Sequence, residues 1–140
     1  MRAEPITVVV DNAIKELARD PAFELSRERV GDDELVTIRS HRLDSRTAAV
    51  LGIRVGRSGV LVSVADSQAL ELSLDEIEAD LSRIVTALRT SQLYVLRDAE
   101  RGVISRLRGP GFEFVLPVRY RRSHSAWVNV DSLGVEGSSD

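Results

Sequence analysis

The sequence predicts an α+β fold with antiparallel sheets and two main helices, in the order helix, about four strands, helix, about four strands. Two segments carry apolar residues at helical spacing, and each is followed by runs of alternating apolar and polar residues. Turn signals rich in glycine separate those runs, as in hairpins. Whether the two halves share one continuous sheet, and whether a duplication relates them, stays open at this level.

The composition fits one folded domain. The chain has 140 residues, of which 43% are hydrophobic and 29% charged, and this is enough to bury a core without disulfides. The last residues are rich in Gly, Ser and acids and offer little to bury. We therefore predict a single α+β domain over residues 1–132 and a flexible tail over residues 133–140.

The first element is expected to be a helix that starts after Pro5 and ends at Asp20-Pro21. Its apolar stripe consists of Ile6, Val9, Val10, Ile14 and Leu17. The three consecutive valines also allow a short strand over residues 6–10, followed by a shorter helix capped by Asp11. The long helix is the preferred interpretation.

Period-two patterns then predict two hairpins. The first begins at Phe23, turns at Gly31-Asp32-Asp33 and returns over Leu35 to Arg39. The second joins Ala48 to Val55 with Val60 to Ala65 through a four-residue link that contains two glycines.

The second helix is expected to begin after Ser73, because Ser73 and Glu76 have the spacing of a capping box. Its apolar stripe is Leu74, Ile77, Leu81, Ile84, Val85 and Leu88. Arg89 suits the negative end of the helix dipole.

Four further strands should follow this helix: Leu93 to Arg97, Val103 to Leu107, Phe112 to Tyr120 and Ala126 to Val130. Gly109-Pro110-Gly111 is the turn expected between the second and the third of them. In the third of them, alternation places Phe112 and Phe114 on one face and Glu113 and Arg119 on the other. Arginine side chains are thus expected on the outer face of these strands.

No catalytic motif emerges from the sequence. Cysteine is absent, which excludes a disulfide, a thiolate metal site and a cysteine nucleophile. The two histidines, His41 and His124, have no metal-ligand spacing, and no serine lies in a nucleophile elbow. We therefore expect no metal and no cofactor; a non-enzymatic role is favoured, and whether the protein is an enzyme stays open.

Charge is segregated along the chain. An acidic set at the start of the second helix comprises Asp75, Glu76, Glu78 and Asp80, and the helix dipole already favours acids there. A basic set on the later strands comprises five arginines and one tryptophan: Arg106, Arg108, Arg119, Arg121, Arg122 and Trp127. Either set could bind a partner of opposite charge, and the arginines could instead protect edge strands from aggregation.

These features favour a non-enzymatic protein-interaction module of the bacterial cytoplasm, such as an immunity or chaperone-like protein, that binds a protein partner by charge complementarity. The cytoplasm is expected because the chain has neither a membrane-length apolar run nor a signal-peptide pattern at its start. The bias to 18 arginines over a single lysine is explained more simply by a GC-rich genome than by phosphate recognition. A small anionic ligand and a homodimer are the alternatives, and six aromatic residues argue against nucleic acid.

The opening Ile6-Thr7-Val8-Val9-Val10-Asp11, the helix after it and Phe23-Glu24-Leu25 resemble the tandem βαβββ modules of glyoxalases and dioxygenases. The run from Gly59 to Asp66 and the second helix would start a second module. The resemblance implies a small-ligand-binding domain or an enzyme, with Glu113 as a metal ligand. No histidine stands in the first strand to match the ligands of that family.

Overall fold

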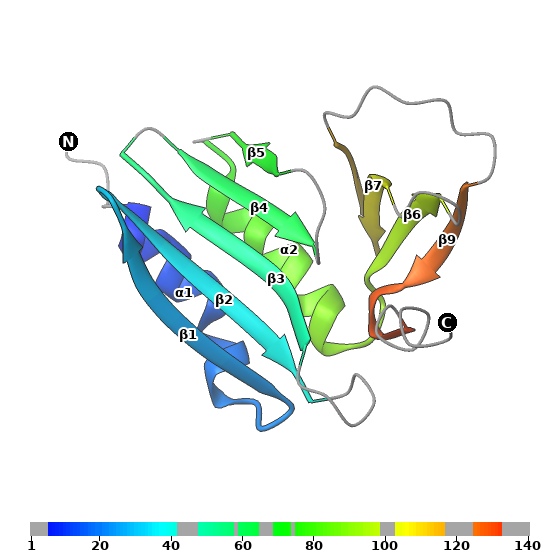
Figure 1. Ribbon diagram of the computed structural model, residues 1–140, viewed down its shortest axis with the longest axis horizontal. Coiled ribbons are helices and arrows are strands. Elements are labelled where there is room, and N and C mark those ends of the chain that lie inside the picture. Colours follow the sequence, from blue (N-terminus) through cyan, green and yellow to red (C-terminus); the bar gives the residue numbers. More distant parts are fainter. Residues whose placement is uncertain are drawn as a thin grey trace.

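The structure is a computed structural model, which describes residues 6–41, 48–57, 59–64, 69–73, 75–98, 103–116 and 125–132. Its helices are α1 (Ile6–Arg19) and α2 (Ile77–Arg89), with a short 3-10 helix η1 (Val130–Ser132). Its strands are β1 (Phe23–Val30), β2 (Asp33–Ser40), β3 (Ala48–Val55), β4 (Val60–Val64), β5 (Leu70–Leu72), β6 (Tyr94–Asp98), β7 (Ile104–Gly109), β8 (Phe112–Val115) and β9 (Ser125–Asn129). The predicted α+β class and element order are confirmed (Figure 1).

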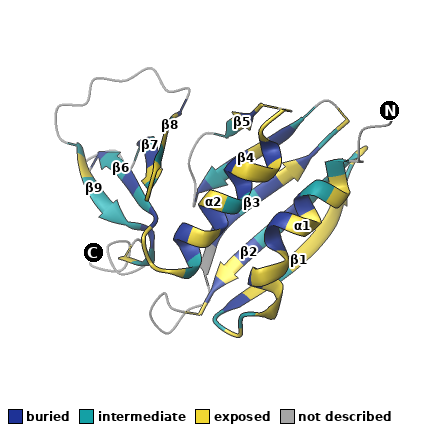
Figure 2. Ribbon diagram, turned by 180° about the vertical axis from the view of Figure 1, so that it is seen from behind, coloured by how far each residue is buried: buried dark blue, intermediate teal, exposed yellow. Residues whose placement is uncertain are grey.

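The strands form two antiparallel sheets instead of one. The first sheet has the order β1-β2-β3-β4-β5, and the second sheet has the order β8-β7-β6-β9. Both helices lie on the same face of the first sheet, and the second sheet lies beside the end of α2 (Figures 1 and 2). Buried side chains from the helices and from both sheets belong to one hydrophobic cluster. The strand β5, which the sequence did not predict, completes the first sheet.

The long form of α1 is correct, and residues 6–10 are helical. Val10 is 1% exposed and Leu17 is fully buried, whereas Val8 on the opposite side is 42% exposed. Burying one stripe against α2 and the sheet outweighs the modest extended preference of three valines.

The predicted capping box at the start of α2 is wrong. The helix begins at Ile77, its N-cap is Glu76, and no side chain caps it. The backbone N–H of Glu76 donates to the carbonyl of Ser73 at 3.0 Å, so these residues form a turn before the helix. Of the predicted apolar stripe, the five residues from Ile77 onward are buried, and Leu74 lies outside the described residues.

Turn chemistry fixes two of the hairpins. Gly31 has a φ of 64° at the first central position of the β1–β2 turn, where only residues tolerant of positive φ fit. In the β7–β8 turn Pro110 precedes Gly111, whose φ is 80°, the pattern of a type II turn. Both turns fall where the sequence predicted them.

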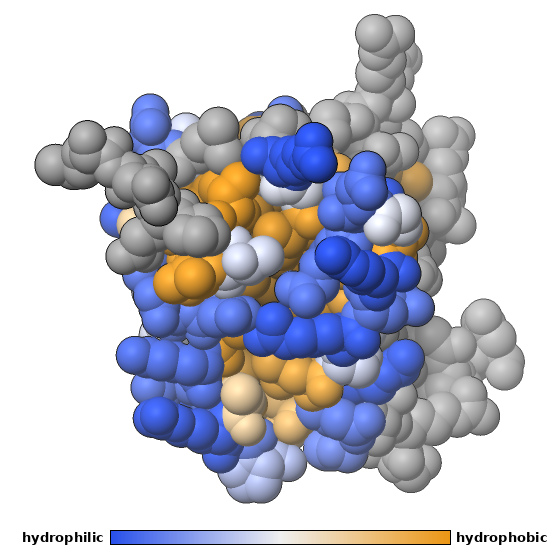
Figure 3. Space-filling view, turned by 90° about the vertical axis from the view of Figure 1, so that its left-hand side faces the viewer, coloured by the Kyte–Doolittle hydropathy of each residue, from blue (hydrophilic) through white to orange (hydrophobic). Residues whose placement is uncertain are grey.

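The edge strand β1 presents charged side chains. Arg27 pairs with Asp11 of α1 at 2.7 Å and with Glu34 of β2 at 3.3 Å. On the side of the molecule that carries β1 and α1, hydrophilic side chains surround a hydrophobic area and also lie over its middle (Figure 3). Charges on an edge strand hinder further strand pairing, so this edge is protected from aggregation.

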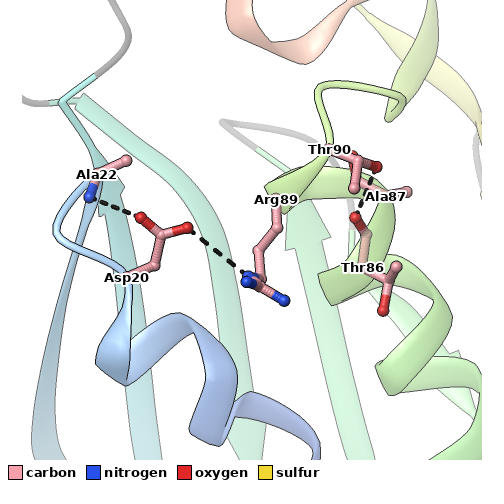
Figure 4. A network of polar contacts seen from close by, with 6 residues as sticks. All are labelled: Asp20, Ala22, Thr86, Ala87, Arg89 and Thr90. Carbon is pink, nitrogen blue, oxygen red and sulfur yellow. Dashed lines mark hydrogen bonds and ion pairs between the residues drawn. The ribbon is translucent and has the colours of Figure 1, made fainter.

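Polar contacts join the ends of the two helices (Figure 4). Asp20, just after α1, accepts a hydrogen bond from the backbone N–H of Ala22 at 2.9 Å and lies 3.6 Å from Nε of Arg89. Thr90 ends α2 by donating its hydroxyl to the carbonyl of Thr86 at 2.8 Å.

Neither helix in the described part of the chain is long and apolar enough to cross a membrane.

Candidate interaction surface

The second sheet turns one face outward, and strand register places eight side chains on it. Residues directly opposite each other on antiparallel strands project from the same face. One row across the four strands is Val115, Arg106, Leu96 and Trp127. The neighbouring row is Glu113, Arg108, Tyr94 and Asn129. We call these eight residues the outer face.

The two sides of the second sheet differ sharply in burial. Val95 and Leu107, on the inner side, are at most 1% exposed and belong to the core. No residue of the outer face is buried, and Val115 is 64% exposed, more than any other large hydrophobic side chain in the described ranges. The alternation predicted for Phe112 to Leu116 is therefore confirmed. A sheet face with apolar, aromatic and charged side chains in solvent is suited to contact with another molecule.

Arg106 and Glu113 form an ion pair on this face. Nη1 of Arg106 lies 2.7 Å from Oε2 of Glu113, and both side chains are about a third exposed, at 33% and 38%. The contact is diagonal, because the residue opposite Glu113 in register is Arg108. The ion pair with Arg106 engages Glu113, which is the only carboxylate among the eight residues of the outer face. Arg108 therefore has no carboxylate partner on this face.

Arg108 instead lies over an aromatic ring. Its guanidinium carbon is 3.9 Å from the centroid of the Trp127 ring, across the intervening strand β6. Such a cation–π contact holds the guanidinium plane in place. Within the described part of the chain, Arg108 has no ion pair and no hydrogen bond from its guanidinium. Its N–H groups are thus held ready for a planar anion such as a carboxylate.

An open hollow of about 370 Å³ adjoins Arg108. It is lined by Gln92, Tyr94, Arg108, Gly109 and Pro110, at the end of the sheet nearest α2. The stacked arginine therefore forms part of a concave site.

The structure brings together three of the predicted basic-set residues, Arg106, Arg108 and Trp127. Arg119, Arg121 and Arg122 lie outside the described residues, as do His124 and the tail predicted over residues 133–140. Tyr94, Leu96 and Asn129 of the outer face were not predicted from the sequence. Alternation along 94–98 and 125–129 could have placed them on one face, but the register that joins the strands is not visible in the sequence.

The acidic set is divided by the fold. Asp75, Glu76 and Glu78 are exposed, whereas Asp80 is 7% exposed and pairs with Arg83 at 3.5 Å. Asp80 therefore belongs to the structure of α2, and only the other three remain available to a basic partner.

The described residues hold no group of three or more His, Cys, Asp or Glu side chains placed to bind a metal ion. His41 lies 3.7 Å from Glu24, with both side chains largely exposed. Glu113, the ligand implied by the glyoxalase-like resemblance, is paired with Arg106. The strand that this resemblance expects at the opening is helical.

Comparison with known proteins assigns no family. No family model, no curated protein and no solved structure matches this chain.

Proposed function

We propose that this chain is a non-enzymatic protein-interaction module that binds an acidic partner protein on the outer face of the second sheet. The observation that carries the proposal is Arg108, which is stacked 3.9 Å from Trp127 and has no carboxylate partner among the described residues. Arginine, tryptophan and tyrosine are the residue types that dominate binding energy at protein interfaces.

The arrangement also reduces the entropic cost of binding. A free arginine loses much rotamer freedom when it binds, but the indole already restricts Arg108. The exposed Val115 and the half-buried Leu96 and Trp127 add apolar area beside the charge. This combination supports a complex in which charge guides association and apolar contact holds it.

The proposal includes a bacterial cytoplasmic setting and a role as an immunity or chaperone-like protein, which covers a partner by charge complementarity. The separation of acidic and basic residues along the sequence supports this role. A homodimer that forms through the outer face is an alternative form of the same interaction.

The test is an affinity pull-down from a lysate of the source organism at low and at high salt, with the tagged full chain as bait and mass spectrometry as readout. We expect a stoichiometric protein partner that is captured at low salt and lost at high salt, because exposed charge contacts are screened. The variants Arg108→Ala and Trp127→Ala should lose this partner.

A matched control is Arg39→Ala, an exposed arginine on the first sheet that has no ion pair in the described structure. It should retain the partner. The double variant Glu76→Lys and Glu78→Lys should retain it as well. Capture that survives Arg108→Ala but is lost in the acidic-set variant would contradict the proposal and assign binding to a basic partner at α2.

A small anionic ligand is a second candidate, favoured by a different cleft. This open cleft of about 760 Å³ lies between α1 and the β1–β2 and β3–β4 turns, and Arg29 and Arg57 line it without an ion pair among the described residues. Clefts of this size accommodate small ligands. A thermal shift that rises with phosphate or citrate concentration and disappears in Arg57→Ala would support this candidate, because binding to the native state must stabilise it.

A further inference from the structure

A second hollow continues the concave site onto α2. It measures about 310 Å³, and its lining includes Ser82, Arg83, Thr86 and Thr90 on the exposed side of the helix. It shares Gln92 and Pro110 with the 370 Å³ hollow beside Arg108. The two hollows therefore adjoin, and we call them together the α2–β6 groove; Arg83 lines the hollow on α2 and Arg108 lines the hollow on the second sheet.

The charge of this groove is one-sided. Its described lining contains Arg83 and Arg108 but no carboxylate, unlike the cleft at α1, where Asp11, Asp32 and Glu34 accompany the arginines. The Arg83 side chain is 55% exposed, and among the described residues it pairs only with Asp80, at the long distance of 3.5 Å. Both ends of the groove can therefore receive an anionic group.

The middle of the groove offers hydrogen-bond donors. The carboxamide of Gln92 is exposed there, with its Oε1 3.3 Å from Oγ1 of Thr90. The side-chain nitrogen of Gln92 has no partner among the described residues. A donor of this kind suits the carbonyl groups of an extended backbone.

The length of the groove fits a short peptide. Arg83 to Thr90 spans about 10 Å along the helix axis, and Gln92 to Tyr94 spans about 7 Å of strand. Because the chain turns at Ser91 between these two stretches, their lengths do not add, and the helix stretch alone matches about three residues of extended chain at about 3.3 Å each.

We infer that the α2–β6 groove binds an extended acidic segment of the partner protein, with one carboxylate at Arg108 and a second, a few residues away, at Arg83. This inference rests on the proposed function and names the part of the partner that is recognised. The segment would lie across Pro110 and Gln92, and the stacked Trp127 would support the first contact from below Arg108.

The test uses fluorescence anisotropy of three labelled peptides and the full chain at low salt. The peptides are otherwise neutral and differ only at two positions a few residues apart, which hold glutamate at both, glutamate at one, or glutamine at both. We expect the two-glutamate peptide to bind about threefold to fivefold tighter than the one-glutamate peptide, which is the effect of one additional exposed ion pair.

Protein variants test the Arg83 end and the Arg108 end of the groove separately. Arg83→Gln should abolish the higher affinity that the second glutamate gives. Thr86→Trp should have the same effect, because it fills the helix end of the groove from an exposed position. Arg108→Gln should weaken both glutamate peptides about tenfold. Arg39→Gln is the charge-matched control and should change nothing. Circular dichroism of each variant verifies that it is folded.

Equal affinity of the one- and two-glutamate peptides, or an advantage that survives both Arg83→Gln and Thr86→Trp, would overturn the inference. If Arg108→Gln still weakened binding in that case, the outer face would stand as the interaction surface without the groove. If no peptide bound, the inference would fail, and the pull-down with Arg108→Ala would decide the proposed function separately.

Discussion

Oδ2 of Asp20 lies 3.6 Å from Nε of Arg89, and this contact joins the C-terminal ends of α1 and α2 (Figure 4). The two residues are 69 positions apart in the sequence. The same carboxylate accepts the N–H of Ala22 through its other oxygen, so one side chain ends the helix and ties it to its neighbour.

Asp20→Ala removes both contacts, and we expect it to lower the free energy of unfolding by about 1–2 kcal/mol. Asp20→Asn keeps an acceptor for Ala22 and loses only the ion pair, so its cost should stay below about 1 kcal/mol. Urea unfolding followed by circular dichroism measures both. Asp32→Ala, at an exposed turn position, is the control. A cost for Asp20→Ala no larger than that of the control would contradict the role of this contact.

Trp127 is the single tryptophan of the chain, so selectively excited tryptophan fluorescence reports on the outer face alone. Arg108→Ala uncovers the ring that the guanidinium lies over at 3.9 Å, and we expect a red shift of the emission as water reaches the indole. Losing a partly exposed cation–π contact should also lower the free energy of unfolding by about 0.5–1 kcal/mol. Arg54→Ala, on the first sheet, should leave the spectrum unchanged. An unshifted spectrum in Arg108→Ala would show that the two side chains are not stacked in solution.

Gly109 marks the place where the β7–β8 hairpin meets α2. A Cβ atom at this position would lie 2.6 Å from the Phe112 ring and 2.9 Å from the Cβ of Ala87. Gly109→Ala should therefore destabilise the protein by about 1–3 kcal/mol through overpacking. At Gly52 an added Cβ would be closest to the rotatable Ser63 hydroxyl, so Gly52→Ala should cost less. The midpoints of urea unfolding compare the two, and the reverse order would contradict close docking of the hairpin.

Ser91 has a φ of 59°, and its hydroxyl donates to Asp131 at 2.7 Å. Ser91→Ala keeps the left-handed backbone and loses the bond, and we expect a cost of about 0.5–1.5 kcal/mol. Ser91→Gly loses the same bond but relieves the backbone strain, so it should be close to neutral. Thermal unfolding of the two variants and of Asp131→Ala measures the difference. If Ser91→Gly were the more destabilising variant, the strain at this position would be disproved.

Much of the fold follows from local patterns. The stripe that ends at Leu17, the Gly31 and Pro110-Gly111 turns and the alternation from Phe112 to Leu116 each depend on neighbours within a few residues, and the sequence predicted all of them. The capping box at Ser73 failed although its local signal was strong. There a turn follows β5, and Ile77 directly after it is only 3% exposed. Burial of Ile77 in the core sets the start of the helix.

The candidate site, in contrast, depends mainly on contacts between segments that are distant in the sequence. The sequence selected Arg106, Arg108 and Trp127 by charge and residue type, but it could not show that Glu113 pairs with Arg106 and leaves Arg108 to the indole. Those contacts depend on the order β8-β7-β6-β9 and on register, and both are set by long-range packing. Nor could it show that Arg83 of α2 and Arg108 of β7 line one groove.

By itself the sequence determined the α+β class, the two helices, the hairpins and the absence of thiol chemistry, because composition, periodicity and turn residues act over short distances. Only the tertiary structure decided that the strands divide into two sheets, that Asp80 is buried and that Arg108, which has no ion pair among the described residues, lies over the Trp127 ring. These features arise where segments distant in sequence compete for the same neighbours, and the free energy of the whole core decides which contacts form.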